Sequence, residues 1–268
     1  MLSIKKIFMN KKKLPKKTIF LHIPKTAGQS IRAEFIKEIG NGVVSDIQTY
    51  DQAESSCFEE VNKYDFYSGH IDFEDLNRKF SSYETFVFTI LRDPKERIAS
   101  FYLYLKKEAE LLNPDELNLS SNTGKKNLLE NSIEEYFFSS DASFKKFIDD
   151  MYMNFYVRYF CQKTYRSNPN SDGQVVSLEK ALNEIENLDL IGFIDNLDFV
   201  SKRIKGELGV DIDLKKRKIN ANKMIDTKWN IFRKMCDEEN KTLTTRIQSY
   251  FLEEDLLFYN KLKVKYEN

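Results

Sequence analysis

The feature that most constrains this chain is a short apolar segment that ends abruptly in a loop of small residues. Thr18–Ile23 reads TIFLHI, and Pro24 and Gly28 follow it closely. A run of β-branched and aromatic residues that is stopped by proline and glycine predicts a buried strand leading into a functional loop. From Ser30 onward apolar side chains recur every four residues until Gly40, which predicts a helix.

A second strand, loop and helix follow later in the chain. Thr85–Leu91 reads TFVFTIL, and this continuously apolar or β-branched run predicts a strand that is covered on both faces. Asp93 and Pro94 are the residue types expected at a helix N-cap and at the first helical position. Weaker strand patterns lie at 64–71 and 189–194.

Strands that alternate with helices predict an α/β fold with a mostly parallel central sheet flanked by helices. Further helices are expected at 144–161, at 199–208 and from residue 230 onward. Ligands of such sheets bind beyond the carboxyl ends of the strands, so the loops after the first and third strands should be neighbours. The polar stretch 113–131 predicts an insertion, and its segment 120–127 is expected to be a loop or partly ordered. We expect a single domain over 18–268.

The charge balance excludes a general attraction to nucleic acid or to an acidic membrane. The chain has 268 residues, with 42 Lys and Arg against 42 Asp and Glu, so any anion site must be local. The basic N-terminal segment 1–17 contains an apolar patch too short for a signal peptide or a membrane span. Cys57, Cys161 and Cys236 lack the close spacing of a zinc site. These features predict a cytoplasmic protein without a metal ion.

The first loop, His22 to Ser30, reads HIPKTAGQS and is suited to holding a phosphate. Small residues let main-chain N–H groups turn towards an anion, the helix N-terminus adds a partial positive charge, and Lys25 adds a full one. The G-x-x-x-x-G-K-[ST] spacing is absent because Lys25 precedes Gly28, which makes a P-loop-like kinase or NTPase the less favoured alternative. Taken alone, Lys25 is equally well explained as a solvated turn residue.

The second loop, Arg92 to Ser100, reads RDPKERIAS and offers a guanidinium and a hydroxyl two helical turns further on. A forked guanidinium makes bidentate, charge-assisted hydrogen bonds to phosphate. The alternative is that Arg92 pairs with a local carboxylate and that Ser100 fills a small packing space.

These two segments together resemble the signature motifs of sulfotransferases that use 3′-phosphoadenosine 5′-phosphosulfate (PAPS), especially the carbohydrate O-sulfotransferase branch. HIPKTAGQS is similar to the 5′-phosphosulfate loop of that family, and LRDPKERIASFY is similar to its 3′-phosphate motif. The resemblance implies a P-loop-like sulfotransferase fold. It also implies an enzyme that transfers the sulfuryl group of PAPS to a hydroxyl of a saccharide or saccharide-containing acceptor and releases the desulfated nucleotide (PAP).

The resemblance assigns roles to individual residues. Lys25 is expected to stabilise charge on the leaving phosphate. His70, which follows Gly69, is similar to the histidine that acts as the family's general base, and neutral imidazole can accept a proton at cytosolic pH. Asp72 and Glu74 are alternative bases, and His22 is expected to be structural. The residues expected to bind the nucleotide are Pro24, Lys25, Thr26, Ala27, Gly28, Gln29, Ser30, Arg92 and Ser100.

Weaker similarities concern the acceptor and the nucleotide flap. The segment 154–160 resembles a helix that lines the acceptor side, so Asn154 and Arg158 are candidate substrate contacts, although such an arginine is commonly stacked or salt-bridged. The basic run 215–218 is interpreted either as a flap over the nucleotide or as a solvated turn. A catalytically inactive PAP- or PAPS-binding protein is the second alternative. The acceptor's identity, the adenine contacts and the oligomeric state are left open by the sequence.

Overall fold

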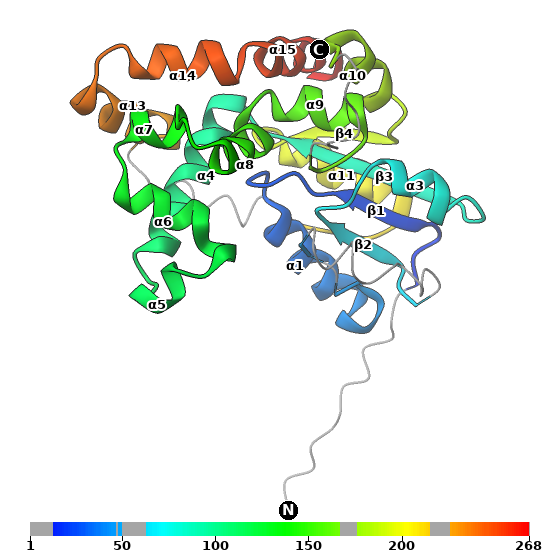
Figure 1. The fold of residues 1–268 in the computed structure, drawn as a ribbon. Helices are drawn as coiled ribbons and strands as arrows, with labels where there is room; N and C mark the ends of the chain where they lie inside the picture. Colours follow the sequence, from blue (N-terminus) through cyan, green and yellow to red (C-terminus); the bar gives the residue numbers. More distant parts are fainter. Residues whose placement is uncertain (1–12, 47, 50–62, 167–175, 215–225, 268) are drawn as a thin grey trace, which may run out of the picture. The chain divides into compact units, whose positions relative to one another are not determined.

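The computed structural model describes residues 13–46, 48–49, 63–166, 176–214 and 226–267 (Figure 1). The chain forms two compact units. Unit 1 comprises Met1–Ile23, Ala27–Ile90 and Leu188–Ile219, and unit 2 comprises Pro24–Thr26, Leu91–Asn187 and Asn220–Asn268. Each unit has its own hydrophobic core. The single domain expected over 18–268 stays a prediction.

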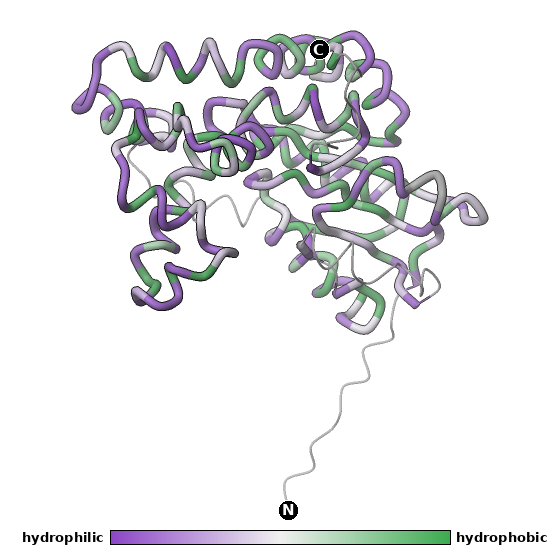
Figure 2. Tube along the Cα trace, viewed as in Figure 1, coloured by the Kyte–Doolittle hydropathy of each residue, from purple (hydrophilic) through white to green (hydrophobic). Residues whose placement is uncertain are grey.

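Unit 1 contains a four-stranded parallel sheet, which confirms the predicted fold class. Its strands are β1 (Lys17–Leu21), β2 (Phe66–Gly69), β3 (Thr85–Leu91) and β4 (Leu190–Phe193), arranged in the order β2-β1-β3-β4. In the register of the central strands Phe20 lies opposite Ser68 on one side and Phe88 on the other. Hydropathy colouring shows the apolar residues that run along these strands (Figure 2).

One face of this sheet is covered by α1 (Gly28–Ile39) and α11 (Leu197–Leu208), which share its core. Successive strand residues point to opposite faces. Accordingly, Phe66 stacks on Phe35 of α1 at 3.9 Å between ring centroids, and its neighbour Tyr67 meets Phe80 at 5.0 Å. Phe80 follows the short helix α3 (Glu74–Lys79). Each fully buried aromatic side chain contributes about 1.5–3 kcal/mol.

Unit 2 is helical, and its core is built largely from aromatic side chains such as Tyr102, Tyr136, Phe137 and Phe232. Hydrophilic and hydrophobic residues alternate along its helices (Figure 2), as expected for helices that bury one face. The helices are α4 (Pro94–Ala109), α5 (Pro114–Leu117), α6 (Thr123–Glu130), α7 (Ile133–Phe137), α8 (Ala142–Tyr152), α9 (Phe155–Gln162), α10 (Leu178–Ile185), α13 (Lys228–Glu239), α14 (Leu243–Phe251) and α15 (Glu253–Glu267). Short 3₁₀ turns are η1 (Asn41–Val43) in unit 1 and η2 (Ser120–Asn122) in unit 2.

The polar stretch 113–131 contains helices, and the loop expected at 120–127 was wrong. It forms α5, η2 and α6. Asn113 and Glu116 make a capping box, in which each side chain bonds the other's main-chain N–H at 2.9 Å. Gly124 packs so closely on Phe147 that an added Cβ would lie 2.7 Å from its ring. Capping and a single buried leucine, Leu128, therefore order a segment whose composition favours a loop.

The segment 144–161, expected to be helical, forms two helices, α8 and α9, which are separated at Asn154, whose φ is 37°. The Asn154 Oδ1 accepts hydrogen bonds from the N–H groups of Glu254 and Asp255 at 3.1 and 3.2 Å. In return, Asp255 Oδ1 accepts from Val157 N at 3.0 Å. Thus α9 and α15 cap each other's N-termini, which satisfies otherwise unpaired donors at both helix ends.

The last residues of the N-terminal basic segment, Lys16 and Lys17, are part of the folded unit 1. Lys17 begins β1 and pairs with Asp65 at 3.3 Å, and Lys16 pairs with Glu84 at 3.4 Å. The lysines before residue 13, Cys57 and the basic run 215–218 lie outside the described residues.

Asp255 predicts a measurable pH dependence of stability. Burial raises the pKa of Asp255 to about 6, although Arg97 opposes the shift. Because the folded state then holds a proton that the unfolded state has lost, stability should fall as the pH rises from about 4 to about 6. A shift of about two pKa units corresponds to about 3 kcal/mol. In chemical denaturation, the stability difference between wild type and Asp255→Asn should decrease by this order over that range. Parallel pH profiles for the two proteins would contradict it.

Candidate active site

The loop after β1 has an unusual backbone at two non-glycine residues. Lys25 and Ala27 both have a φ of 70°, in the left-handed region that costs side-chain-bearing residues about 1–3 kcal/mol and that clusters at functional sites. Ala27 forms the N-cap of α1, and its carbonyl accepts hydrogen bonds from the N–H groups of Ser30 and Ile31 at 3.0 and 3.2 Å. The Ser30 N–H, expected to face a phosphate, is therefore already bonded within the first helical turn.

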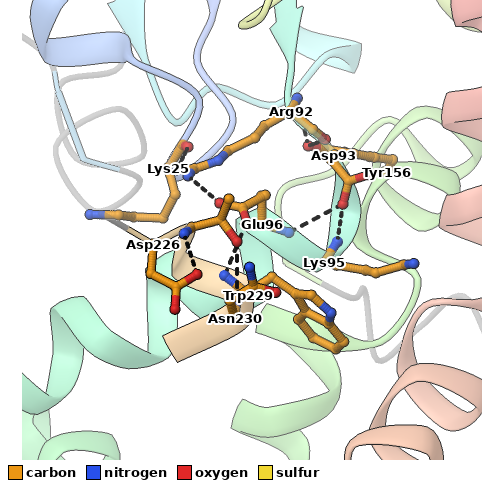
Figure 3. A network of polar contacts seen from close by, with 10 residues as sticks. Lys25, Arg92, Asp93, Lys95, Glu96, Tyr156, Asp226, Trp229 and Asn230 are labelled. Atoms are coloured by element: carbon orange, nitrogen blue, oxygen red, sulfur yellow. Dashed lines mark hydrogen bonds and ion pairs between the residues drawn. The ribbon is translucent and has the colours of Figure 1, made fainter. Parts of the chain in front are cut away.

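Arg92 is fixed in unit 2 by both its main chain and its side chain (Figure 3). Its N–H donates to the Tyr156 hydroxyl at 3.1 Å, and that hydroxyl donates to the Arg92 carbonyl at 2.8 Å. The guanidinium donates through Nη2 to Glu96 Oε2 at 2.9 Å and through Nη1 to the Lys25 carbonyl at 3.4 Å. The loops that carry Lys25 and Arg92 are therefore neighbours in unit 2, as the sequence predicted.

One face of α4 carries the groups around these two cations. Glu96, Ser100 and Tyr104 are spaced four residues apart along α4, which places them on the same side of the helix. Glu96 holds Arg92, and the Lys25 Nζ lies 3.8 Å from the centroid of the Tyr104 ring. Ser100 is thus on the helix face that carries the contacts to both cations, and its side chain is largely buried.

A third cation comes from the N-terminus of α13. Lys228 is the first residue of that helix, and the N–H of the next residue, Trp229, donates to Glu96 Oε1 at 3.0 Å. Burial and the charges of Arg92 and Lys228 lower the pKa of Lys25 to about 8, while Glu108 opposes the shift. The cluster of Lys25, Arg92 and Lys228 is therefore a region of positive potential in which an additional anion would be stabilised.

The network at the start of α13 also holds that helix in place (Figure 3). The Thr227 hydroxyl accepts from Asn230 N at 3.1 Å, and Asp226 pairs with Lys234 at 2.7 Å. Glu96, Tyr104, Tyr156 and Lys228 were not singled out from the sequence. The i, i+4 spacing of Tyr104 from Ser100 was an available signal, whereas the contact between Glu96 and Trp229 joins residues far apart in the chain.

The two histidines of the chain lie together in unit 1. His70 bonds the His22 carbonyl at 2.7 Å through Nδ1, and the two rings stack at 4.6 Å between centroids. Burial lowers the pKa of His70, so the imidazole is neutral at pH 7. The tautomer that donates through Nδ1 carries its lone pair on Nε2, which is the form a general base requires.

Gly28 leaves the space that the His22 ring fills. A Cβ at Gly28 would lie 2.0 Å from His22 Nε2, and His22 also stacks on Phe20 at 5.5 Å. The packing of His22 therefore requires a glycine at position 28. The His22 carbonyl in turn forms the hydrogen bond to His70. This agrees with the structural role expected for His22.

The candidate substrate residues Asn154 and Arg158 have structural contacts. Arg158 is only 7% exposed, and its Nη2 donates to the carbonyls of Asp150 and Tyr165 at 2.6 and 3.2 Å. Its guanidinium lies 5.1 Å from the Phe155 ring, and Asn154 caps α15. The stacked arrangement weighed from the sequence is present, and the acceptor-binding role of both residues stays a prediction.

The protein has an α/β fold with a parallel sheet. The loops after β1 and β3 bring Lys25 and Arg92 together in a local cationic site. The chain belongs to the sulfotransferase family, whose sequence model matches residues 6–266. The predicted membership of the sulfotransferase family is thereby confirmed. No curated protein gives a significant match to the sequence. Within the described ranges, no helix combines the length and apolarity needed to cross a membrane.

Gly28→Ala should disturb the histidine pair. The added methyl must displace the His22 ring, so the free energy of unfolding should fall by about 1–3 kcal/mol, and the imidazole signals of both histidines should shift. Chemical denaturation and NMR of the ring nitrogens would measure this, since the chain has only two histidines.

Gly206→Ala is the matched control for that substitution. Nothing lies within 4 Å of a Cβ at Gly206 in α11, so alanine should leave the histidine signals unchanged and stabilise the helix by about 0.5–1 kcal/mol. Equal effects of the two substitutions would show that Gly28 has no special packing role.

Proposed function

We propose that this sulfotransferase family member is a PAPS-dependent O-sulfotransferase. It transfers the sulfuryl group of PAPS to an acceptor hydroxyl and releases PAP. The observation that carries the proposal is the cluster of Lys25, Arg92 and Lys228 in unit 2, where burial and then the repulsion from Arg92 and Lys228 lower the pKa of Lys25 to about 8. A nucleotide with phosphate groups at two positions would relieve this repulsion.

The residues of unit 2 suit the two ends of that nucleotide. Lys25 is proposed to hold the 5′-phosphosulfate, and the fork of Arg92 with the Ser100 hydroxyl is proposed to hold the 3′-phosphate. Pro24, Thr26, Ala27, Gly28, Gln29 and Ser30 are proposed to complete the loop around the donor. Arg92 is now bonded to Glu96, and a doubly charged phosphate would compete with that single carboxylate for the guanidinium.

In the proposed reaction the acceptor oxygen forms a bond to sulfur while the bond between sulfur and the 5′-phosphate oxygen breaks. Lys25, protonated in about nine-tenths of molecules at pH 7 when its pKa is about 8, stabilises the negative charge that develops on the leaving phosphate. His70 takes the proton of the acceptor hydroxyl on Nε2. The products are a sulfated acceptor, PAP and one proton.

The acceptor is proposed to be a saccharide or a saccharide-containing molecule, and this rests on the resemblance of the two motifs to carbohydrate O-sulfotransferases. A cytoplasmic location is proposed from the sequence features described above. A P-loop-like kinase or an inactive PAP-binding protein are the alternatives. Transfer of labelled sulfate from PAPS, compared with transfer of the γ-phosphate of ATP, would distinguish all three.

Lys25→Ala should lower kcat at saturating PAPS by about two to three powers of ten, because it removes a preorganised charge. Arg92→Ala should mainly weaken PAP binding, measured by calorimetry, since it removes the phosphate fork. Lys202→Ala, which removes an exposed lysine on α11, is the control and should leave both quantities unchanged. Unaltered turnover of Lys25→Ala would remove Lys25 from the chemistry.

The pH profile of kcat/KM should have two limbs. The acid limb requires neutral His70, whose pKa burial lowers from 6.5, so activity should be lost only below pH 6.5. The alkaline limb requires protonated Lys25, so activity should fall as the pH rises through about 8.

Single substitutions can show which residue is responsible for each limb of the pH profile. His70→Ala should abolish the acid limb and most of the activity, and Lys25→Arg should move the alkaline limb beyond the measurable range because arginine stays protonated. A His70→Ala enzyme with the wild-type rate would exclude His70 as the base.

A further inference from the structure

Tyr104 is a large aromatic residue of α4 that is 43% exposed to solvent. Its ring lies 3.8 Å from the Lys25 Nζ, well inside the range of about 6 Å in which an ammonium is attracted to the face of an aromatic ring. Tyr104 is therefore only partly buried, and its contact with Lys25 is a specific interaction of the ring face with a charged group.

Lys25 needs such a partner because other groups around it repel it. Arg92 and Lys228 are the cations that act on it, while Glu108, one helical turn beyond Tyr104, attracts it. The negative face of the ring favours the charged amine and gives it a preferred direction, without the competing hydrogen bonds of a carboxylate. Burial, together with Glu108, raises the pKa of the Tyr104 hydroxyl, so the ring stays neutral wherever Lys25 is charged.

The position of Tyr104 also fixes where Lys25 lies relative to Arg92. Glu96 and Tyr104 are eight residues apart on one face of α4, about 12 Å along the helix axis. Glu96 holds the guanidinium of Arg92, and Tyr104 holds the ammonium of Lys25. A single rigid helix therefore carries the contact to each cation.

We propose that Tyr104 is a positioning residue for the sulfuryl-transfer step, whose ring holds the Lys25 ammonium in the orientation that the reaction uses. The inference rests on the proposed function, because it assigns Tyr104 to the reaction of Lys25. The ring face, and not the phenol hydroxyl, is the part that acts. Phenylalanine should therefore replace tyrosine, and leucine should not.

The test compares Tyr104→Phe with Tyr104→Leu. The leucine variant should lower kcat about ten-fold while the KM for PAPS stays within about two-fold, because the lost contact orients a charge that matters most in the transition state. The phenylalanine variant should keep both constants within about two-fold of wild type. Tyr250→Leu, which removes a similarly exposed tyrosine on α14 (48% exposed), is the control and should have no effect on either constant.

A second readout does not depend on activity. The pH dependence of acetylation of Lys25 by acetic anhydride, followed by mass spectrometry, reports its pKa in the protein without nucleotide. Its midpoint should be near pH 8 in wild type, unchanged in Tyr104→Phe, and lower by about half a unit in Tyr104→Leu.

The outcomes separate the two proposals. A leucine variant with the wild-type midpoint and kcat would overturn the role of Tyr104, as would a phenylalanine variant impaired as strongly as the leucine variant. A wild-type protein that transfers no sulfuryl group would overturn the proposed function, while the midpoints would still decide whether Tyr104 holds Lys25.

Discussion

The arrangement of unit 2 depends on how it accommodates three neighbouring cations. Lys25 and Lys228 lie close enough for the charge of one to act on the other, and the Lys25 carbonyl accepts from Arg92. Like charges at short range destabilise the folded state unless an anion or a polarisable group is placed among them. Glu96 supplies that anion through both of its oxygens, one facing Arg92 and the other facing the N-terminus of α13. This one carboxylate therefore links the arginine loop to a helix that comes much later in the sequence.

Hydrogen bonds in the interior of unit 2 hold Arg92 and the helices around it in fixed positions. Tyr156 closes a pair of hydrogen bonds with the main chain of Arg92, and the helix that carries Tyr156 is capped by the buried Asp255. Arg97 is almost fully buried, donates to the Met151 carbonyl at 3.1 Å, and lies 4.7 Å from the Phe155 ring. Buried charges with specific partners are costly to break, so α4, α9 and α15 are held together by more than apolar packing. The partly buried cations Lys25 and Arg92 consequently lie on a well-packed support.

The sequence predicts those parts of the fold that local patterns determine. Thr85–Leu91 is continuously apolar because it lies inside the sheet, and the observed β3 has the expected limits. Asp93 caps α4 by accepting from Lys95 N and Glu96 N, as its place before Pro94 indicates. The proximity of Lys25 and Arg92 follows from parallel topology alone. These residues carry their structural information within a few positions of themselves.

Contacts between distant segments could not be read from the sequence. The break at Asn154 depends on α15, about a hundred residues later, and the second partner of Glu96 is the main chain of Trp229. The helices within 113–131 depend on Gly124 meeting Phe147, whereas the capping box of Asn113 and Glu116 is a local pattern that composition alone does not reveal. At Asn154 and Glu96 a polar residue that suits a loop or a surface acquires a specific partner only when the chain folds.

The hydrogen bonds of Glu96 and Asp93 help to distinguish a kinase-like site from a site that holds an anion with cationic side chains alone. A kinase-like site needs carboxylate oxygens that are available to bind magnesium alongside the nucleotide. Here Glu96 accepts hydrogen bonds on both oxygens, and an Asp93 oxygen accepts from the first turn of α4. An anion bound at this cluster would therefore be neutralised mainly by Lys25, Arg92 and Lys228. Under the proposed function, the leaving phosphate is neutralised directly by cationic side chains. The orientation of Lys25 then matters more to the reaction than the total charge of the site.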